Sequence, residues 1–177
     1  MGTDKAALDF AGTTLAARVA KVLGQVAYPV LAVGPEAGTG LFTVQDSREG
    51  PLGAFASGMG ALAARGHAGP VLLVACDMPL LEASLLRFIV SRLGDADAAV
   101  PVVGGYDQPL CAAYGPKAAG VAARLSGEEL RSMHEFLRYL LVRRLPQSEW
   151  DHLAPAHALM DVDTPEELER AKRISDA

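Results

Sequence analysis

Short apolar runs alternate with amphipathic stretches along the first two thirds of the chain. Val-rich runs bounded by Gly, Pro or Asp predict strands at Pro29–Gly34, Leu41–Asp46, Val71–Asp77 and Ala98–Val103. Apolar residues at helical spacing predict helices at Leu15–Leu23, Leu52–Arg65 and Leu81–Leu93. Strands that are apolar throughout and alternate with helices are typical of a parallel sheet covered on both faces. The predicted class is therefore α/β, with three layers.

The second half departs from this alternation. One more strand is predicted at Pro109–Tyr114, followed by helices at Pro116–Leu125 and Glu128–Arg144 and by an irregular segment from Pro146 to Leu159. A last helix has a clear start. Thr164 is placed to cap it, Pro165 occupies its first position, and Glu167 follows at the third, which is the pattern of a capping box.

Length and composition indicate one folded unit. The chain has 177 residues, of which 50% are hydrophobic and 21% charged, so it can bury a sizeable core, and we expect a single domain over residues 1–177. The net charge of −5 argues against a nucleic-acid binder. A local cationic pocket for a phosphorylated small molecule is compatible with that charge.

Nothing in the sequence predicts export or a membrane. Met1–Phe10 carries charged residues where a signal peptide would be apolar, and no uninterrupted apolar run reaches the roughly 18 residues of a membrane helix. Cys76 and Cys111 form no disulfide or zinc pattern, and the four His show no metal spacing. We expect a soluble protein of the cytoplasm.

Asp77 is the first candidate for chemistry, because it follows a predicted buried strand directly. Ligands of open α/β sheets bind beyond the carboxyl ends of the strands. A carboxylate there can hold Mg²⁺ on the phosphates of a nucleotide, since Mg²⁺ takes one or two carboxylates together with phosphate and water oxygens. The alternative is that Asp77 caps a helix that starts near Leu80 or Leu81. The spacing alone leaves both open.

Two further segments could contact phosphates. The run from Asp46 through Gly50-Pro51-Leu52-Gly53 opens a helix, so its glycines and free N–H groups could approach a ligand, although the run taken alone favours an ordinary Gly-Pro turn with Pro at a helix start. Lys5 could neutralise phosphate charge, although a lone Lys near a terminus is commonly just solvated.

Taken together, these segments resemble the molybdenum cofactor guanylyltransferase family of the MobA type. Five pieces occur in the order of the family and span nearly the whole chain: Met1–Ala6, Asp46 with Gly50–Gly53, Cys76–Pro79, Gln108–Ala112 and Asp161–Leu168. The resemblance implies a Rossmann-like nucleotidyltransferase sheet that is mostly parallel, with an antiparallel strand in the second half. It also implies transfer of GMP from GTP to the phosphate of molybdopterin, with release of pyrophosphate.

The resemblance assigns roles to individual residues. It implies that Asp77 holds Mg²⁺ and that Lys5 contacts the GTP phosphates, so that these two carry catalysis. The nucleotide pocket would be formed by Gly2, Lys5, Asp46, Gly50, Pro51, Leu52, Gly53 and Asp77. The pterin half of the site would be faced by Gln108, Pro109, Asp161, Asp163 and Thr164. The partners implied are GTP, molybdopterin and, transiently, other proteins of the molybdenum cofactor pathway.

Two features depart from the family. Its members carry a strand and a glycine-rich loop of the form LAGGxSxRMG before the Asp-Lys pair, and this sequence starts at the last two residues of that loop, Met1-Gly2. We therefore expect Met1 to be an internal Met of a longer protein. The C-terminal turn has Asp161 and Asp163 where the family usually has Asn, and an added negative charge near a phosphorylated substrate is unfavourable.

Two alternatives remain. One is a related nucleotidyltransferase that uses another nucleotide or acceptor, such as a cytidylyl or sugar-phosphate enzyme. The other is a non-catalytic module that binds a nucleotide, a cofactor or a partner.

Overall fold

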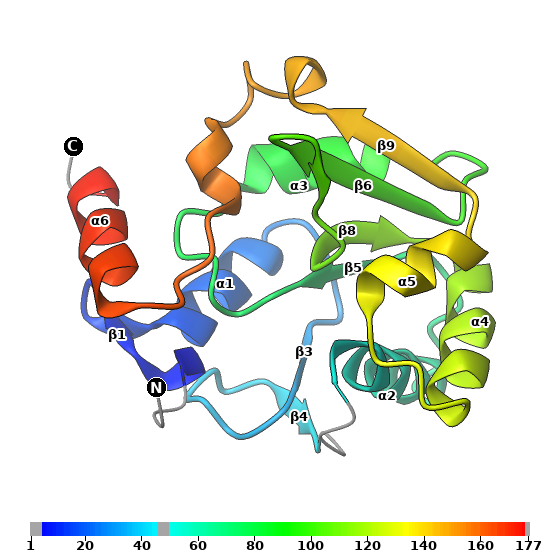
Figure 1. Ribbon diagram of the computed structural model, residues 1–177. Coiled ribbons are helices and arrows are strands. Elements are labelled where there is room, and N and C mark those ends of the chain that lie inside the picture. Colours follow the sequence, from blue (N-terminus) through cyan, green and yellow to red (C-terminus); the bar gives the residue numbers. More distant parts are fainter. Residues whose placement is uncertain (1–4, 46–49, 176–177) are drawn as a thin grey trace.

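A computed structural model describes residues 5–45 and 50–175 (Figure 1). Its helices are α1 (Leu15–Leu23), α2 (Pro51–Ala63), α3 (Ala83–Ser91), α4 (Pro116–Gly127), α5 (Met133–Phe136) and α6 (Pro165–Ser175). Its strands are β1 (Asp9–Phe10), β2 (Thr13–Thr14), β3 (Leu31–Val33), β4 (Phe42–Val44), β5 (Val71–Val74), β6 (Ala98–Val103), β7 (Tyr106–Asp107), β8 (Cys111–Tyr114) and β9 (Val142–Pro146). Short 3-10 turns occur at Lys5–Ala7, Leu137–Tyr139, Gln147–Glu149 and Ala156–Leu159.

The main sheet has the strand order β5-β8-β6-β7, and β9 pairs with the other side of β6. Strand β8 is antiparallel to both β5 and β6, whereas β9 is parallel to β6. The antiparallel strand expected in the second half is therefore confirmed. Strands β5, β6 and β9 share one direction, as a mostly parallel sheet requires. Most hydrogen-bonded neighbours are nevertheless antiparallel, because β8 lies between β5 and β6 and β7 folds back on β6.

Strands β3 and β4 form a separate parallel pair, with Ala32 opposite Thr43. The predicted strands at Pro29–Gly34 and Leu41–Asp46 are thus confirmed, with β4 ending at Val44. Strands β1 and β2 form a third, antiparallel pair near the N-terminal end of the described residues.

Two hydrophobic cores cover opposite faces of the main sheet, which confirms the three layers. Cys111 and Ala113 of β8 pack with α1 and α3, whereas Ala112 and Tyr114 pack with α2, α4 and α5. Successive side chains of a strand point to opposite faces, so an apolar strand such as β8 contributes to both cores. Figure 1 shows α3 behind the sheet and α2, α4 and α5 gathered at its other side.

The helix predicted over Glu128–Arg144 is wrong at both ends, since residues 128–132 are a turn and irregular backbone and only Met133–Tyr139 is helical. Helix α5 covers only Met133–Phe136, and β9 begins at Val142. In β9 the side chains of Arg143 and Arg144 are exposed and that of Leu145 is fully buried. Pairing with β6 along the whole of β9 overrides the apolar helical spacing of the preceding residues.

The last helix begins as predicted. Thr164 Oγ1 accepts a hydrogen bond from the N–H of Glu167 at 3.2 Å, and Glu167 Oε2 accepts one from the N–H of Thr164 at 2.8 Å. These reciprocal bonds are the capping box. A third core, which includes Phe10, Leu15 and Val162, joins α6 to the N-terminal segment, and α6 and β1 lie on the same side of the molecule in Figure 1.

Candidate functional site

Asp77 lies at the carboxyl end of β5. The pairing of β5 with β8 continues one residue past the strand, because the N–H of Ala75 donates to the carbonyl of Leu110 at 2.8 Å. Cys76 is then exposed, and Asp77 is half-buried. Helix α3 begins at Ala83, with Glu82 as its N-cap, so Asp77 does not cap it. Of the two interpretations left open by the sequence, helix capping is wrong.

The C-terminal turn predicted for the acceptor lies beside Asp77. The N–H of Val162 donates to the carbonyl oxygen of Asp77 at 2.9 Å. The Val162 side chain is fully buried, whereas Asp161, Asp163 and Thr164 are exposed. Burying Val162 therefore fixes the turn and leaves its polar residues at the surface next to the end of β5.

Gln108 and Pro109 reach the same edge of the sheet from β8. Because β8 is antiparallel to β5, with Cys111 opposite Val74, the residues that precede β8 lie at the carboxyl end of β5. Gln108 is half-buried, and its N–H donates to the carbonyl of Pro101 at 2.8 Å. The expected edge is thus formed by segments from three parts of the chain.

Pro109 is the second residue of this segment that was expected to face the pterin half of the site. It is buried, and its carbonyl accepts a hydrogen bond of 2.7 Å from the buried Tyr114 hydroxyl. This bond anchors the turn that carries Gln108.

The start of α2 fits the predicted pocket only in part. Gly50 is the N-cap with φ of 87°, and a Cβ there would lie 3.1 Å from Cβ of Arg131, so the turn requires glycine. Leu52 and Gly53 are buried, and the N–H of Leu52 already donates to the carbonyl of Arg131 at 3.3 Å. The N–H of Leu52 is therefore not one of the free N–H groups expected at the start of α2, and Gly50 and Pro51 are the accessible residues there.

Three predicted residues cannot be placed in the site. Gly2 and Asp46 lie outside the described residues, and of Lys5 only the backbone is described, in a 3-10 turn.

Arg18 is a cation near this edge that the sequence reasoning missed. Its Nε donates to the carbonyl of Pro79, two residues after Asp77, and its guanidinium lies 4.9 Å from the centre of the Phe10 ring. Arg18 lies in an ordinary amphipathic helix, α1, so no local signal distinguishes it from a solvated Arg. Only the tertiary contact with Pro79 does so.

The chemistry of this edge is electrostatic. Within residues 5–45 and 50–175, no three His, Cys, Asp or Glu side chains gather as a metal cage. One carboxylate at a strand end is nevertheless a fitting donor set for a cation that takes its other ligands from phosphate and water. Burial raises the pKa of the Cys111 thiol to about 12 and also raises the pKa of Tyr114, so neither is a nucleophile at neutral pH.

Several solved structures share the fold of this chain. Molybdopterin-guanine dinucleotide biosynthesis protein A from Archaeoglobus fulgidus has a TM-score of 0.80 and is 21% identical, covering 99% of this chain and 92% of its own. A 2-C-methyl-D-erythritol 4-phosphate cytidylyltransferase from Thermus thermophilus has a TM-score of 0.71 and is 18% identical over 98% and 94%. A Mycobacterium tuberculosis protein solved with manganese has a TM-score of 0.67 and is 20% identical over 97% and 93%. The fold class is the Rossmann-like nucleotidyltransferase fold.

The chain belongs to the family of the MobA-like NTP transferase domain, whose model matches residues 1–147. A relative from Natronomonas pharaonis named "Probable molybdenum cofactor guanylyltransferase" is 31% identical over 96% of this chain and 88% of its own length. A relative of the same name from Bacillus cytotoxicus is 32% identical over 58% of this chain and 50% of its own. A divalent metal is typical of MobA-like nucleotidyltransferases.

Proposed function

We propose that this protein transfers GMP from GTP to the phosphate of molybdopterin and releases pyrophosphate. The observation that carries the proposal is the hydrogen bond from Val162 to Asp77, because it joins the segment assigned to the acceptor to the strand-end carboxylate assigned to the nucleotide. Relatives at about 30% identity that bear the name guanylyltransferase support the choice of GTP and of molybdopterin.

The reaction requires positioning and charge stabilisation. A phosphate oxygen of molybdopterin attacks the α-phosphorus of GTP, the bond from that phosphorus to the bridging oxygen breaks, and the electron pair leaves with pyrophosphate. Negative charge builds up on the phosphate oxygens, so cations and N–H donors aimed at them lower the barrier. No covalent intermediate with the enzyme is needed.

Asp77 would hold Mg²⁺, which supplies charge to the phosphates when it is bound. Lys5 would contribute a second cation, and Gly50 and Pro51 the close approach of the backbone at the start of α2. Gln108, Asp161, Asp163 and Thr164 would face the acceptor. The half-buried position of Asp77 supports its role, because a carboxylate there is partly shielded from water and acts more strongly on a neighbouring charge.

The partners that follow are small molecules, GTP and molybdopterin, with transient contacts to other proteins of the same pathway in the cytoplasm. Within residues 5–45 and 50–175, no helix has the length and apolar character of a membrane span.

The test is a panel of GTP, CTP, ATP and UTP with Mg²⁺, read by thermal unfolding and by pyrophosphate release in the presence of molybdopterin. A nucleotide at 100 times its Kd should stabilise the folded state by about 2.7 kcal/mol. We expect a shift with GTP and release that requires GTP and molybdopterin together. A shift selective for CTP would contradict guanylyl transfer in favour of a cytidylyl enzyme, and binding without release would favour the non-catalytic module.

A further inference from the structure

Asp107 of β7 and Arg144 of β9 form a two-point ion pair at the carboxyl end of β6. Nε of Arg144 lies 3.0 Å from Oδ1 of Asp107, and Nη2 of Arg144 lies 3.0 Å from Oδ2. The Asp107 side chain is only 18% exposed, whereas that of Arg144 is 58% exposed. A planar guanidinium that binds both oxygens of one carboxylate fixes the relative orientation of the two side chains, which a single contact does not do.

The sheet brings these two residues together although they are 37 positions apart in the chain. Val102 of β6 is opposite Asp107, and Val100 of β6 is opposite Arg144 on the other side of the same strand. Residues opposite each other in neighbouring strands point to the same face of a sheet, and so do residues two apart in one strand. The Arg144 side chain therefore crosses β6 to reach Asp107.

Gln108 lies where the pairing with β6 is interrupted. Between its pairs with β7 and with β8, strand β6 contributes two residues, 100–101, whereas the returning chain contributes five, 108–112. The additional residues leave the ladder as a bulge, and bulges redirect side chains at the edges of sheets. The bulge begins directly after Asp107, so the position of Asp107 determines where Gln108 lies.

Two contacts from other elements hold the start of this bulge. Strand β7 has only two residues, so its pairing with β6 alone is weak. Arg144 binds the Asp107 carboxylate from β9, and Nε2 of His134 in α5 donates to the Asp107 carbonyl oxygen at 3.2 Å. Both contacts fall on the residue before Gln108. Without the ion pair, only the His134 contact and a short ladder would hold it.

We propose that Asp107 and Arg144 are positioning residues for the acceptor, because their ion pair holds Gln108 at the edge of the sheet where the phosphorylated acceptor binds. This inference rests on the proposed function, in which Gln108 faces the acceptor. The pair acts through the backbone of the bulge, and neither side chain has to touch the substrate.

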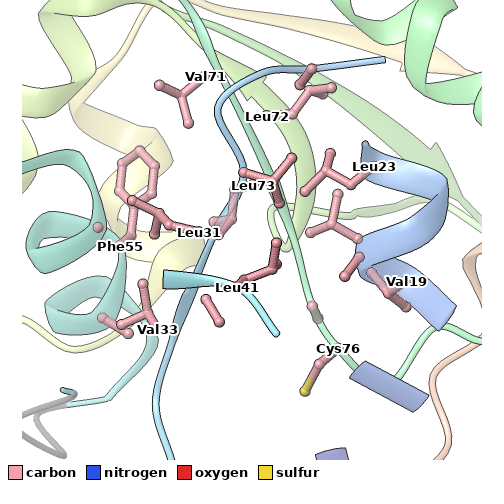
Figure 2. Close-up of a pocket in the computed structure, with 18 of the residues that line it drawn as sticks. Val19, Leu23, Leu31, Val33, Leu41, Phe55, Val71, Leu72, Leu73 and Cys76 are labelled. Atoms are coloured by element: carbon pink, nitrogen blue, oxygen red, sulfur yellow. The ribbon is translucent and has the colours of Figure 1, made fainter. Parts of the chain in front are cut away.

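The pair and the residues assigned to the nucleotide lie at different strands. Asp107 and Arg144 flank β6, whereas Asp77 follows β5, and β8 lies between β5 and β6. Asp77 borders an apolar cavity of about 790 Å³, and Figure 2 shows side chains that line it, among them Leu31 of β3 and Leu73 of β5. Among the described residues, none from β6, β7 or β9 lines this cavity. Substitutions at the pair should therefore change acceptor binding and leave GTP binding unchanged.

The test is a double-mutant cycle, read by steady-state kinetics with varied molybdopterin at saturating GTP. Asp107→Asn keeps the size of the side chain and removes its charge, Arg144→Gln removes the guanidinium, and a third variant carries both substitutions. A fourth variant exchanges the two residues, Asp107→Arg with Arg144→Asp. The matched control is Glu128→Gln, which breaks an exposed pair within α4 where a single nitrogen of Arg124 contacts the carboxylate.

The KM for molybdopterin should rise by about three- to tenfold in each single variant, with kcat and the calorimetric Kd for GTP unchanged. The variant that carries Asn and Gln together should be no worse than the single variants, because the two residues act as one unit. The exchanged pair should recover most of the loss, and Glu128→Gln should match the native chain. Circular dichroism monitors the fold. If Arg144→Gln unfolds, Arg144→Lys, which keeps the charge without the two-point contact, should still raise KM.

An unchanged KM in both single variants would overturn the proposal. So would equal losses of acceptor and GTP binding, which indicate a general structural role, or single effects that add in the double variant, which indicate two independent residues. Absence of turnover by the native chain would overturn the proposed reaction and the role of the pair with it. The turnover of the native chain therefore distinguishes the failure of the reaction from the failure of this inference.

Discussion

The backbone N–H of Val162 and the carbonyl oxygen of Asp77 are joined by a hydrogen bond of 2.9 Å. Val162 is fully buried in the core that it shares with Phe10 and Leu15, so the bond links two fixed segments. The turn of Asp161, Asp163 and Thr164 is thereby held beside the end of β5. Charges on this turn are therefore placed to act on a substrate bound near Asp77.

Asp163→Asn should improve binding of the phosphorylated acceptor. Removing one exposed negative charge near a phosphate is worth about 1 kcal/mol at a separation of 4 Å in water, which corresponds to roughly a fivefold lower KM. Steady-state kinetics with varied molybdopterin would measure it, and kcat should change little. The matched control is Asp151→Asn, at an exposed carboxylate outside the turn. A KM that rises in Asp163→Asn would mean that the carboxylate itself binds the acceptor.

Asp77→Asn should abolish the metal-dependent reaction while the protein stays folded. An amide has the size of the carboxylate without its charge, so the substitution weakens metal binding and stabilisation of the transition state. We expect kcat/KM to fall by about 100-fold or more. The measurement is pyrophosphate release over a range of Mg²⁺ concentrations, with circular dichroism to monitor the fold. Asp95→Asn, at an exposed residue after α3, is the control with unchanged activity. Full activity of Asp77→Asn would place the metal elsewhere.

Acid should weaken the attachment of α6 through Glu167. Its pKa lies below the ordinary value of 4.5, because its carboxylate accepts hydrogen bonds from the N–H of Asp163 and then from the side chain and N–H of Thr164. A carboxyl whose pKa is lowered by folding contributes stability above its unfolded pKa, and this stability is lost as the pH falls through the folded pKa. Urea unfolding of the native chain and of Glu167→Gln should differ at pH 7 and converge in acid.

The neighbouring carboxylate provides the control for that experiment. Glu166 is exposed in the first turn of α6, next to Glu167 in the chain. Glu166→Gln should follow the native chain over the same range. Persistence of the Glu167→Gln difference at low pH would argue that packing, and not ionisation, causes the effect.

Two glycines of α2 should respond in opposite directions to larger side chains. A Cβ at Gly58 would lie 3.1 Å from Cγ2 of Val33, where α2 packs on β3, whereas a Cβ at Gly60 meets no atom within 4 Å. Gly60→Ala should stabilise the protein by about 0.5–1 kcal/mol through helix propensity. Gly58→Val should destabilise it by about 1–3 kcal/mol through overpacking. Chemical denaturation of both variants tests this, and a stabilised Gly58→Val would show that β3 yields to α2.

Local patterns in the sequence were sufficient for much of the fold. Helix α1 covers the predicted residues Leu15–Leu23, and β6 covers the predicted Ala98–Val103, because periodic apolar spacing reports burial directly. Strand β9 was missed because its identity depends on pairing with β6, which lies far away in the chain. The alternation of side chains along β9 covers only a few residues. The apolar residues that precede β9 have helical spacing, so the local pattern favoured a helix.

The site was predictable where a residue type and a strand end coincide, as at Asp77. Resemblance to a family added the turn at Asp161–Thr164, and the structure brings that turn to Asp77 through a backbone bond that no side-chain pattern encodes. The N–H of Leu52 donates a hydrogen bond to the distant carbonyl of Arg131, and no local pattern in the sequence encodes that contact either. The contact of Arg18 with Pro79 is likewise a tertiary feature without a local signal.

The two cysteines differ sharply in their surroundings. Cys111 is fully buried and its thiol stays protonated, whereas Cys76 is exposed, one residue before Asp77. A maleimide dye should therefore label the native chain at one position without any engineering. That position reports on the environment of the strand-end carboxylate, so substrate binding and metal binding could both be followed by fluorescence from one probe.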